Sequence, residues 1–193
     1  MNKLLLLLFV MCCNSSIAQT TDNSYYNSDF KWKMDLPENF EKVPVAEWRK
    51  KQNQGKEAME KTVGAEVDNQ TSILFVLRSG DYNYLEANSQ PFDTAKDGNY
   101  EESCKMVDSL LCATFKAQAP NATIETSTGK ETIGGVEFLT FHLVMHITAE
   151  ISFNCTMYNH LFGKKEFTVN VMYIDADKGK AMTAAWKASQ FDK

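Results

Sequence analysis

The chain has 193 residues, 44% of them hydrophobic, and its 25 acidic and 20 basic residues give a formal net charge of −5. This length fits one domain that is large enough to bury a hydrophobic core. The basic residues form no block, which argues against a nucleic-acid-binding surface because such surfaces need clustered positive charge.

The first 18 residues have the pattern of a secretory signal peptide. Lys3 provides a positive charge, residues 4–11 form a short apolar run, and residues 16–18 (SIA) match the small-x-small pattern that signal peptidase cleaves. We therefore expect cleavage after Ala18 and export to the periplasm or the extracellular space.

An alternative for the leader is acylation of Cys12 or Cys13, which would make the chain a lipoprotein. The residues before these cysteines lack the small side chain that usually precedes an acylated cysteine. After the leader, no run approaches the roughly 20 apolar residues of a membrane-spanning helix. We therefore expect no transmembrane segment in the mature chain.

Residues 19–28 are polar and are expected to form a flexible segment ahead of one domain at 29–193. The domain opens with alternating apolar and charged residues, which is the period of a half-buried strand. Its expected core side chains are Phe30, Trp32, Met34 and Leu36. Pro37 cannot donate to a strand ladder and ends the strand. Phe40 is expected to pack back on the sheet.

The next segments predict helical structure, a strand and a loop. Residues 45–63 are predicted to form one irregular helix or two short ones, because Gln54 and Gly55 interrupt the pattern. Residues 71–79 (TSILFVLRS) are the most continuous apolar run after the leader and predict a central strand that is covered on both faces. Residues 83–99 are predicted to be a long loop.

A long helix is predicted at residues 100–118, since apolar side chains recur at spacings of three and four. This stripe consists of Cys104, Val107, Leu111 and Phe115. Asn99 or Asp97 is expected to cap the start of the helix, and Pro120 follows its end.

The last third of the chain predicts a meander of strands joined by short turns. The expected strands are 123–127, 136–148, 150–162 and 166–175, followed by a helix at 177–189. The order of elements does not alternate strand and helix, so the predicted fold class is α+β, an antiparallel sheet with helices packed on both faces.

These features together resemble the PsbP-like superfamily, which is named for an extrinsic subunit of photosystem II and includes exported and lipid-anchored bacterial members. The resemblance spans residues 29–191 and is carried by "LPENF" after the first strand, the apolar strand, the long helix, the meander and the closing Ser189-Gln190-Phe191. It implies an α/β/α sandwich, usually without enzymatic activity. No residue of the photosynthetic subunit is matched closely enough to carry over a role.

The histidines and cysteines are the first candidates for chemistry. His142 and His146 lie about 13 Å apart on one strand, and the expected register places His160 opposite Phe138, about as far again beyond His142. Ligands of one zinc must each approach to about 2 Å, so no metal site is expected. Cys155 falls nearly opposite His142 but on the other sheet face, which argues against a Cys-His hydrolase.

The mature chain has an odd number of cysteines. Cys104 and Cys112 are about 12 Å apart along the predicted helix, which is too far for a disulfide. A bridge from either of them to Cys155 stays open. We favour three unpaired, buried thiols.

The segment before the long helix is rich in oxygen ligands, but it does not match a calcium-binding loop. Ala95 and Cys104 occupy positions where an EF-hand needs ligands, and helix capping explains the acidic residues. Long loops often carry function, and aromatic residues gather here. The candidate ligand-binding residues are Tyr82, Tyr84, Phe92, Asp93, Asp97 and Tyr100.

Common catalytic and nucleotide-binding motifs are absent from the sequence. We therefore expect an exported, non-catalytic binding or interaction module, with no cofactor and with an unidentified protein as its partner. The alternative is a carrier for a small apolar or lipid ligand, which needs a pocket of about 300 Å³ or more. A hydrolase is the third hypothesis.

Overall fold

The computed structural model describes residues 23–192. The expected signal peptide (1–18), its cleavage after Ala18 and the alternative acylation of Cys12 or Cys13 concern positions that lie outside the described residues. Within the described residues, no helix combines the length and the hydropathy that crossing a membrane requires.

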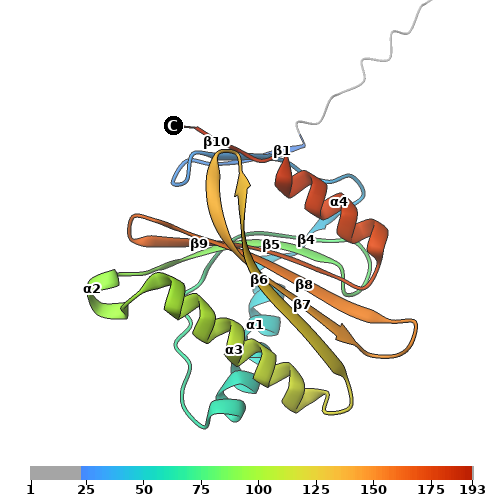
Figure 1. Cartoon of the computed structure of the whole chain (residues 1–193). Coiled ribbons are helices and arrows are strands. Elements are labelled where there is room, and N and C mark those ends of the chain that lie inside the picture. Colours follow the sequence, from blue (N-terminus) through green and yellow to red (C-terminus); the bar gives the residue numbers. More distant parts are fainter. Residues whose placement is uncertain (1–22, 193) are drawn as a thin grey trace, which may run out of the picture.

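Seven strands of the described chain form an antiparallel sheet in the order β3-β4-β5-β9-β8-β7-β6 (Figure 1). Their bounds are β3 Glu41–Lys42, β4 Ser72–Arg78, β5 Tyr84–Pro91, β6 Thr123–Ile133, β7 Val136–His146, β8 Ser152–Phe162 and β9 Lys165–Tyr173. Strands β6 to β9 pair in chain order, which confirms the predicted meander.

A small three-stranded sheet covers one face of this large sheet, together with helix α4 (Figure 1). It consists of β1 Ser24–Asn27, β2 Trp32–Asp35 and β10 Gln190–Phe191, and α4 spans Ala176–Lys187. In β2, Trp32 and Met34 are buried while Lys33 and Asp35 are exposed, as the alternation predicts. Leu36 and Phe40 pack at the margin of the same core.

The expectation of a flexible segment at 19–28 is wrong for Ser24–Asn27. These residues pair with β2 along the whole length of that strand. Tyr25 also packs edge-on against Phe75, with ring centroids 4.8 Å apart. The polar sequence is accommodated because this sheet lies at the surface, where an antiparallel sheet can face water on one side.

Two long helices cover the other face of the large sheet (Figure 1). They are α1 Val45–Val63 and α3 Tyr100–Gln118, and the short α2 Thr94–Asp97 precedes α3. Helix α1 is continuous through Gly55, so the expected interruption is wrong; one glycine weakens a helix without breaking it. Helix α3 has the predicted bounds, and the Asn99 side chain caps it by accepting from the Glu102 N–H. Helices on both faces confirm the predicted α+β class.

Strand β4 is not central, although both its faces are covered as predicted. It lies next to the short edge strand β3, and β9 occupies the middle of the sheet. Phe75 and Leu77 enter the core beneath β2, whereas Val76 packs with Trp48 of α1. The long apolar run therefore reflects cover on both faces and not a central position.

The prediction of a loop at residues 83–99 is wrong for about half of that range. Residues 84–91 form β5, which pairs with both β4 and β9. Leu85 and Ala87 point into the main core, but the alternate positions Glu86, Asn88 and Gln90 are polar. The sequence of β5 therefore alternates with the period of a strand. Its polar residues lie on the sheet face that the helices cover.

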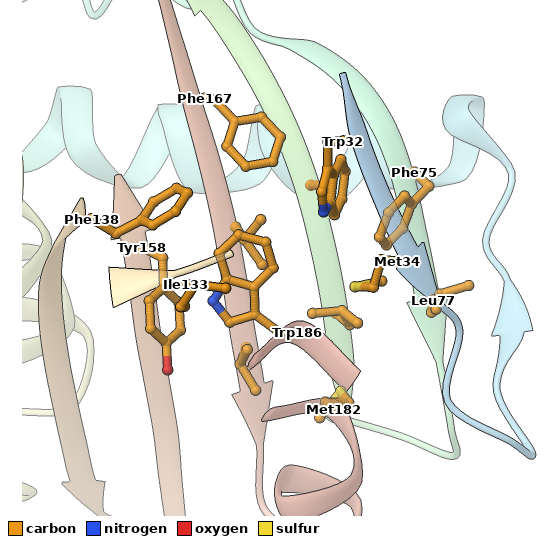
Figure 2. Close-up of a cluster of buried hydrophobic side chains, with 14 of the residues drawn as sticks. Trp32, Met34, Phe75, Leu77, Ile133, Phe138, Tyr158, Phe167, Met182 and Trp186 are labelled. Atoms are coloured by element: carbon orange, nitrogen blue, oxygen red, sulfur yellow. The ribbon is translucent and has the colours of Figure 1, made fainter. Parts of the chain in front are cut away.

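The main core lies between the large sheet and the layer of β2 and α4. Figure 2 shows the Trp186 ring among the side chains of Phe138, Phe167 and Trp32. All four side chains are fully buried, and Trp186 meets Phe138 edge-on at 5.2 Å between ring centroids. Burial of each such ring stabilises the fold by about 2–3 kcal/mol, so this side of the sheet provides the rigid scaffold.

Candidate functional site

A cavity of about 520 Å³ lies between α1, α3 and the large sheet. Along α3, Cys104 is buried and Phe115 packs on Phe153, but Val107 between them is 44% exposed. Val107 therefore departs from the predicted buried stripe. Its side chain borders the cavity instead.

The floor of the cavity is a polar strip on two central strands. In the β5–β9 register, Glu86 is opposite Asn170, Asn88 is opposite Thr168, and Gln90 is opposite Glu166. Alternation places these side chains on one face, towards the helices. A sheet face beneath helices is usually apolar, so this strip is a departure from a simple packed layer.

Glu86 is the most buried charged group of this strip, at 5% exposure. Its Oε1 accepts from Trp48 Nε1 at 2.7 Å and from Gln52 Nε2 at 3.0 Å, and its Oε2 accepts from Asn170 Nδ2 at 3.0 Å. These donors are all neutral. Buried carboxylates are normally paired with a cation, whereas the side-chain hydrogen-bond partners of Glu86 within residues 23–192 are neutral.

The opposite end of the strip is formed by Glu166. Its carboxylate accepts from Tyr100 Oη at 3.1 Å and from Gln90 Nε2. Burial and the neighbouring Glu166 charge raise the pKa of Tyr100, which keeps its hydroxyl a neutral donor. Burial also raises the pKa of the Cys104 thiol to about 12, so neither group is a ready nucleophile at neutral pH.

Three buried oxygens around the cavity have no hydrogen-bond partner within the described protein: Gln52 Oε1, Asn170 Oδ1 and Asp108 Oδ1. The two amides donate their NH₂ groups to Glu86, because a carboxylate only accepts, and this leaves their oxygens free. Burial raises the pKa of Asp108 to about 6. These acceptors are therefore available to a ligand or to water in the cavity.

Gly55 on α1 borders the same cavity. A Cβ added at Gly55 would meet no atom within 4 Å, so packing does not require glycine at this position. Glycine inside a helix costs about 1 kcal/mol relative to alanine. The absent side chain leaves the α1 wall open.

The structure separates the predicted site residues into two groups. Tyr82 and Tyr84 lie at one end of β5, and Phe92 lies beyond the other end, roughly 25 Å away at 3.3 Å per residue. Tyr82 is exposed, with a positive φ of 63°, and Tyr84 packs against Trp48. These aromatic residues therefore do not gather at one place in the fold.

The second group has mainly structural roles. Phe92 is buried and packs edge-on against Tyr100 at 5.1 Å between ring centroids. Asp93 caps α2, and its ion pair with Lys164 at 2.9 Å lowers its pKa. The Asp97 carboxylate accepts from the Asp93 N–H. Capping explains these acidic residues, as predicted. Of the predicted set, Phe92 lines the cavity between α1, α3 and the sheet, and Phe92, Asp93 and Asp97 together line a second pocket of about 510 Å³.

The alternative chemistries gain no support from the geometry. Leu143 is opposite Cys155 and Thr156 is opposite His142, which confirms that Cys155 and His142 lie on opposite faces. That separation contradicts the Cys-His hydrolase. Within residues 23–192, no group of three or more His, Cys, Asp or Glu side chains is placed to hold a metal ion.

Within residues 23–192, the three cysteines are free thiols. Cys104 and Cys155 are buried, as predicted, and Cys112 is only half-buried on α3. Burial, with the nearby Glu86 charge, raises the pKa of Cys155 to about 12. These cysteines therefore act as small apolar side chains.

Comparison with solved structures confirms the PsbP-like fold. The solution structure of cyanobacterial PsbP (CyanoP) from Synechocystis sp. PCC 6803 matches with a TM-score of 0.55 and 10% identity, over 88% of this chain and 91% of that chain. A crystal structure from Bacteroides thetaiotaomicron VPI-5482 matches with a TM-score of 0.45 and 8% identity, over 89% of this chain and 48% of that one. Protein-family models and curated protein sequences give no match. At such low identity, the likeness concerns the fold alone.

Proposed function

We propose that this chain is an exported, non-catalytic binding module that holds a small ligand in the cavity between α1, α3 and the sheet. The observation that carries the proposal is the polar strip beneath the helices, where Glu86 is 5% exposed and has neutral partners. A floor built only for stability would be apolar, because burying unpaired polar groups is costly. The cavity volume of about 520 Å³ is in the usual range for small-molecule sites.

The alternative, a carrier for a wholly apolar or lipid ligand, is favoured by the cavity walls. Apolar side chains from α1, α3, β8 and β9 line them: Met59, Val107, Leu110, Met157 and Met172. The floor argues against it, since hydrocarbon lying on the strip would leave Asn170 Oδ1 without a donor and would cover the Glu86 carboxylate. A ligand with an apolar part and a polar group suits both surfaces.

Export is the part of the proposal that rests on the leader. The pattern of residues 1–18 favours cleavage after Ala18, and the competing idea is acylation at Cys12 or Cys13. Mass spectrometry of the protein from its native host separates the two. A mature chain beginning at Gln19 supports the proposal, and a diacylglyceryl-modified cysteine at the N-terminus would replace it with membrane anchoring.

A plug in the cavity wall tests the binding function. Gly55→Leu adds a side chain where an added Cβ meets no atom within 4 Å, at the edge of the cavity. Asn53→Leu is the matched control, because Asn53 is exposed on the same helix and does not line this cavity. Native mass spectrometry and thermal-shift screening against small organic molecules provide the readouts.

We expect ligands of the unmodified protein to bind Asn53→Leu equally well and Gly55→Leu at least about tenfold more weakly, since the plug takes up ligand volume. Equal binding to all three proteins would place the ligand elsewhere. A screen without a stoichiometric hit would contradict the small-molecule function and favour a protein partner.

A further inference from the structure

The ionisable groups around the cavity are predominantly acidic. Its lining within the described residues includes four acidic side chains, Asp68, Glu86, Asp108 and Glu166. The basic side chain of the lining is Lys56, and its Nζ is already paired with Glu60 at 3.5 Å. A concave site with charges of one sign concentrates ligands of the opposite sign.

The buried polar atoms near Glu86 that lack a partner within the described residues are oxygens, which accept hydrogen bonds. Gln52 Oε1 and Asn170 Oδ1 have no partner within the described protein. Glu86 Oε2 accepts from Asn170 Nδ2 and keeps a free lone pair. Gln52 and Asn170 both donate to Glu86, so the unpaired oxygens belong to two side chains that contact one carboxylate. A ligand carboxylate or phosphate would face acceptors and a like charge here.

An ammonium group matches these acceptors in number and in charge. It carries three N–H donors and one positive charge, and Glu86 supplies the charge partner. A divalent metal fits less well, since within the described residues no three acidic, histidine or cysteine side chains converge. Hard metal ions need about six oxygen ligands.

The cavity also offers room for an apolar body. Met59 and Leu110 line its helical walls, and Met157 and Met172 contribute from the sheet. Methionine side chains adapt to irregular apolar shapes. The site therefore combines a carboxylate with apolar walls.

We infer that the ligand of this cavity is an organic amine, with its ammonium group on Glu86, Gln52 and Asn170 and its apolar part against the methionine-lined walls. This inference rests on the proposed function and adds the chemical class of the ligand. Glu166 lies farther along the floor and Asp108 lies on the α3 wall, and neither is required for the ammonium contact. They strengthen the negative potential of the cavity.

Three probes of equal length test the head group: n-hexylamine, n-hexanol and n-hexanoate, each titrated into the purified protein by calorimetry at about pH 7.5, where the amine is protonated. We expect hexylamine to bind about tenfold or more tighter than the other two, because it alone brings donors and positive charge. Its affinity should fall as salt is added, whereas that of hexanol should not change.

Glu86→Gln assigns the contact. This variant keeps the Oε1 acceptor for Trp48, and the amides of Gln52 and Asn170 can turn to accept from its new NH₂. We expect hexylamine affinity to fall about tenfold or more while hexanol affinity stays within about twofold. Gln52→Met, at a half-exposed position, leaves the charge in place and is expected to lower hexylamine affinity about threefold to tenfold.

Other outcomes separate this inference from the proposed function. Equal or tighter binding of hexanol or hexanoate, or hexylamine binding that Glu86→Gln and Gln52→Met leave unchanged, overturns the amine assignment and leaves a binding module. Binding of none of the three probes also overturns the amine assignment. The binding function is then decided by the Gly55→Leu screen alone. If the circular dichroism spectrum shows that Glu86→Gln does not fold, the amine assignment is decided by the hexylamine affinity of Gln52→Met and by the salt dependence.

Discussion

Trp48 donates its indole N–H to the Glu86 carboxylate over 2.7 Å, in a buried contact that joins helix α1 to the central sheet. The two residues are 38 positions apart in the sequence and are 6% and 5% exposed. The bond fixes the side chain that forms the floor of the cavity and also locates the helix that forms its wall. Cavity shape and fold stability are therefore coupled at one hydrogen bond.

Trp48→Phe tests this coupling. Phenylalanine keeps an aromatic ring against Tyr84 but removes the donor, which leaves part of a buried carboxylate unsatisfied. We expect the free energy of unfolding to fall by about 1–3 kcal/mol, measured by urea denaturation. The variant Trp48→Phe/Glu86→Gln should recover part of that loss, since the unpaired group is then neutral. A single variant as stable as the wild type would mean that the bond does not hold α1.

Asp108 makes stability depend on pH in an unusual direction for a carboxyl group. Burial raises its pKa from the ordinary 3.8 to about 6 in the folded chain, so the folded state binds more protons than the unfolded state between these values. Stability from this group is therefore highest at acid pH and is lost as the pH rises through about 6. The ionised form is a cost in the folded protein at neutral pH.

We expect Asp108→Asn to be more stable than the wild type by about 1 kcal/mol at pH near 7.5, after allowance for the partial exposure of the side chain, and to gain less at about pH 4.5. Urea denaturation at the two pH values provides the comparison. The same difference at both would show that the carboxyl is not desolvated.

Gly134 fixes the β6–β7 hairpin against the end of the chain. Its φ is +56°, and a Cβ would lie 2.7 Å from the Ser189 carbonyl oxygen and 2.8 Å from the Phe191 ring. Gly163, in the β8–β9 turn, has a similar φ of +63° with open space around it. A comparison of substitutions at Gly134 and Gly163 therefore distinguishes the cost of the left-handed backbone from the cost of a steric clash.

We expect Gly163→Ala to cost about 1 kcal/mol from the left-handed backbone alone, and Gly134→Ala to cost about 2 kcal/mol more because β10 must move. Thermal unfolding of both variants measures the difference. Equal losses would indicate that β10 adjusts without a penalty.

The cysteines predict an order of chemical reactivity. Burial raises the pKa values of Cys104 and Cys155 to about 12, whereas Cys112 is half-buried on α3. The thiols of Cys104 and Cys155 are buried and held protonated, so brief alkylation of the native protein with iodoacetamide should label the more accessible Cys112 first. Peptide mass mapping identifies the site, and labelling in urea is the control. Faster modification of Cys104 would indicate that the cavity opens.

The elements that were predicted correctly are those that nearby residues in the sequence determine. Helix α3 has an asparagine cap and apolar spacing along its length, and the alternation of Trp32 and Met34 with charged residues marks β2. The β7–β8 register followed from matching polar faces across a short turn. In each case, the residues that determine the element lie within a few positions of one another.

The cavity was missed because its signal is spread over two strands about 80 residues apart. Glu86, Asn88 and Gln90 resemble loop residues when taken alone, and Glu166, Thr168 and Asn170 resemble the exposed face of a strand. Only the β5–β9 register brings them together beneath α1 and α3. Alternation of buried Leu85 and Ala87 with these polar residues was the available signal, and it predicts a strand but not the cover over its polar face.

Substitution of two helical glycines by alanine is expected to change the free energy of unfolding in opposite directions, because their surroundings differ. Gly55→Ala should raise the free energy of unfolding by about 0.5–1 kcal/mol, because alanine favours the helix and an added Cβ meets no atom within 4 Å. In α4, a Cβ at Gly179 would lie 2.6 Å from the Tyr173 ring, so Gly179→Ala should lower it by about 1–3 kcal/mol. Urea denaturation measures both. A loss of stability in Gly55→Ala would mean that α1 needs glycine for packing, and the open wall would then not be a feature of the binding site.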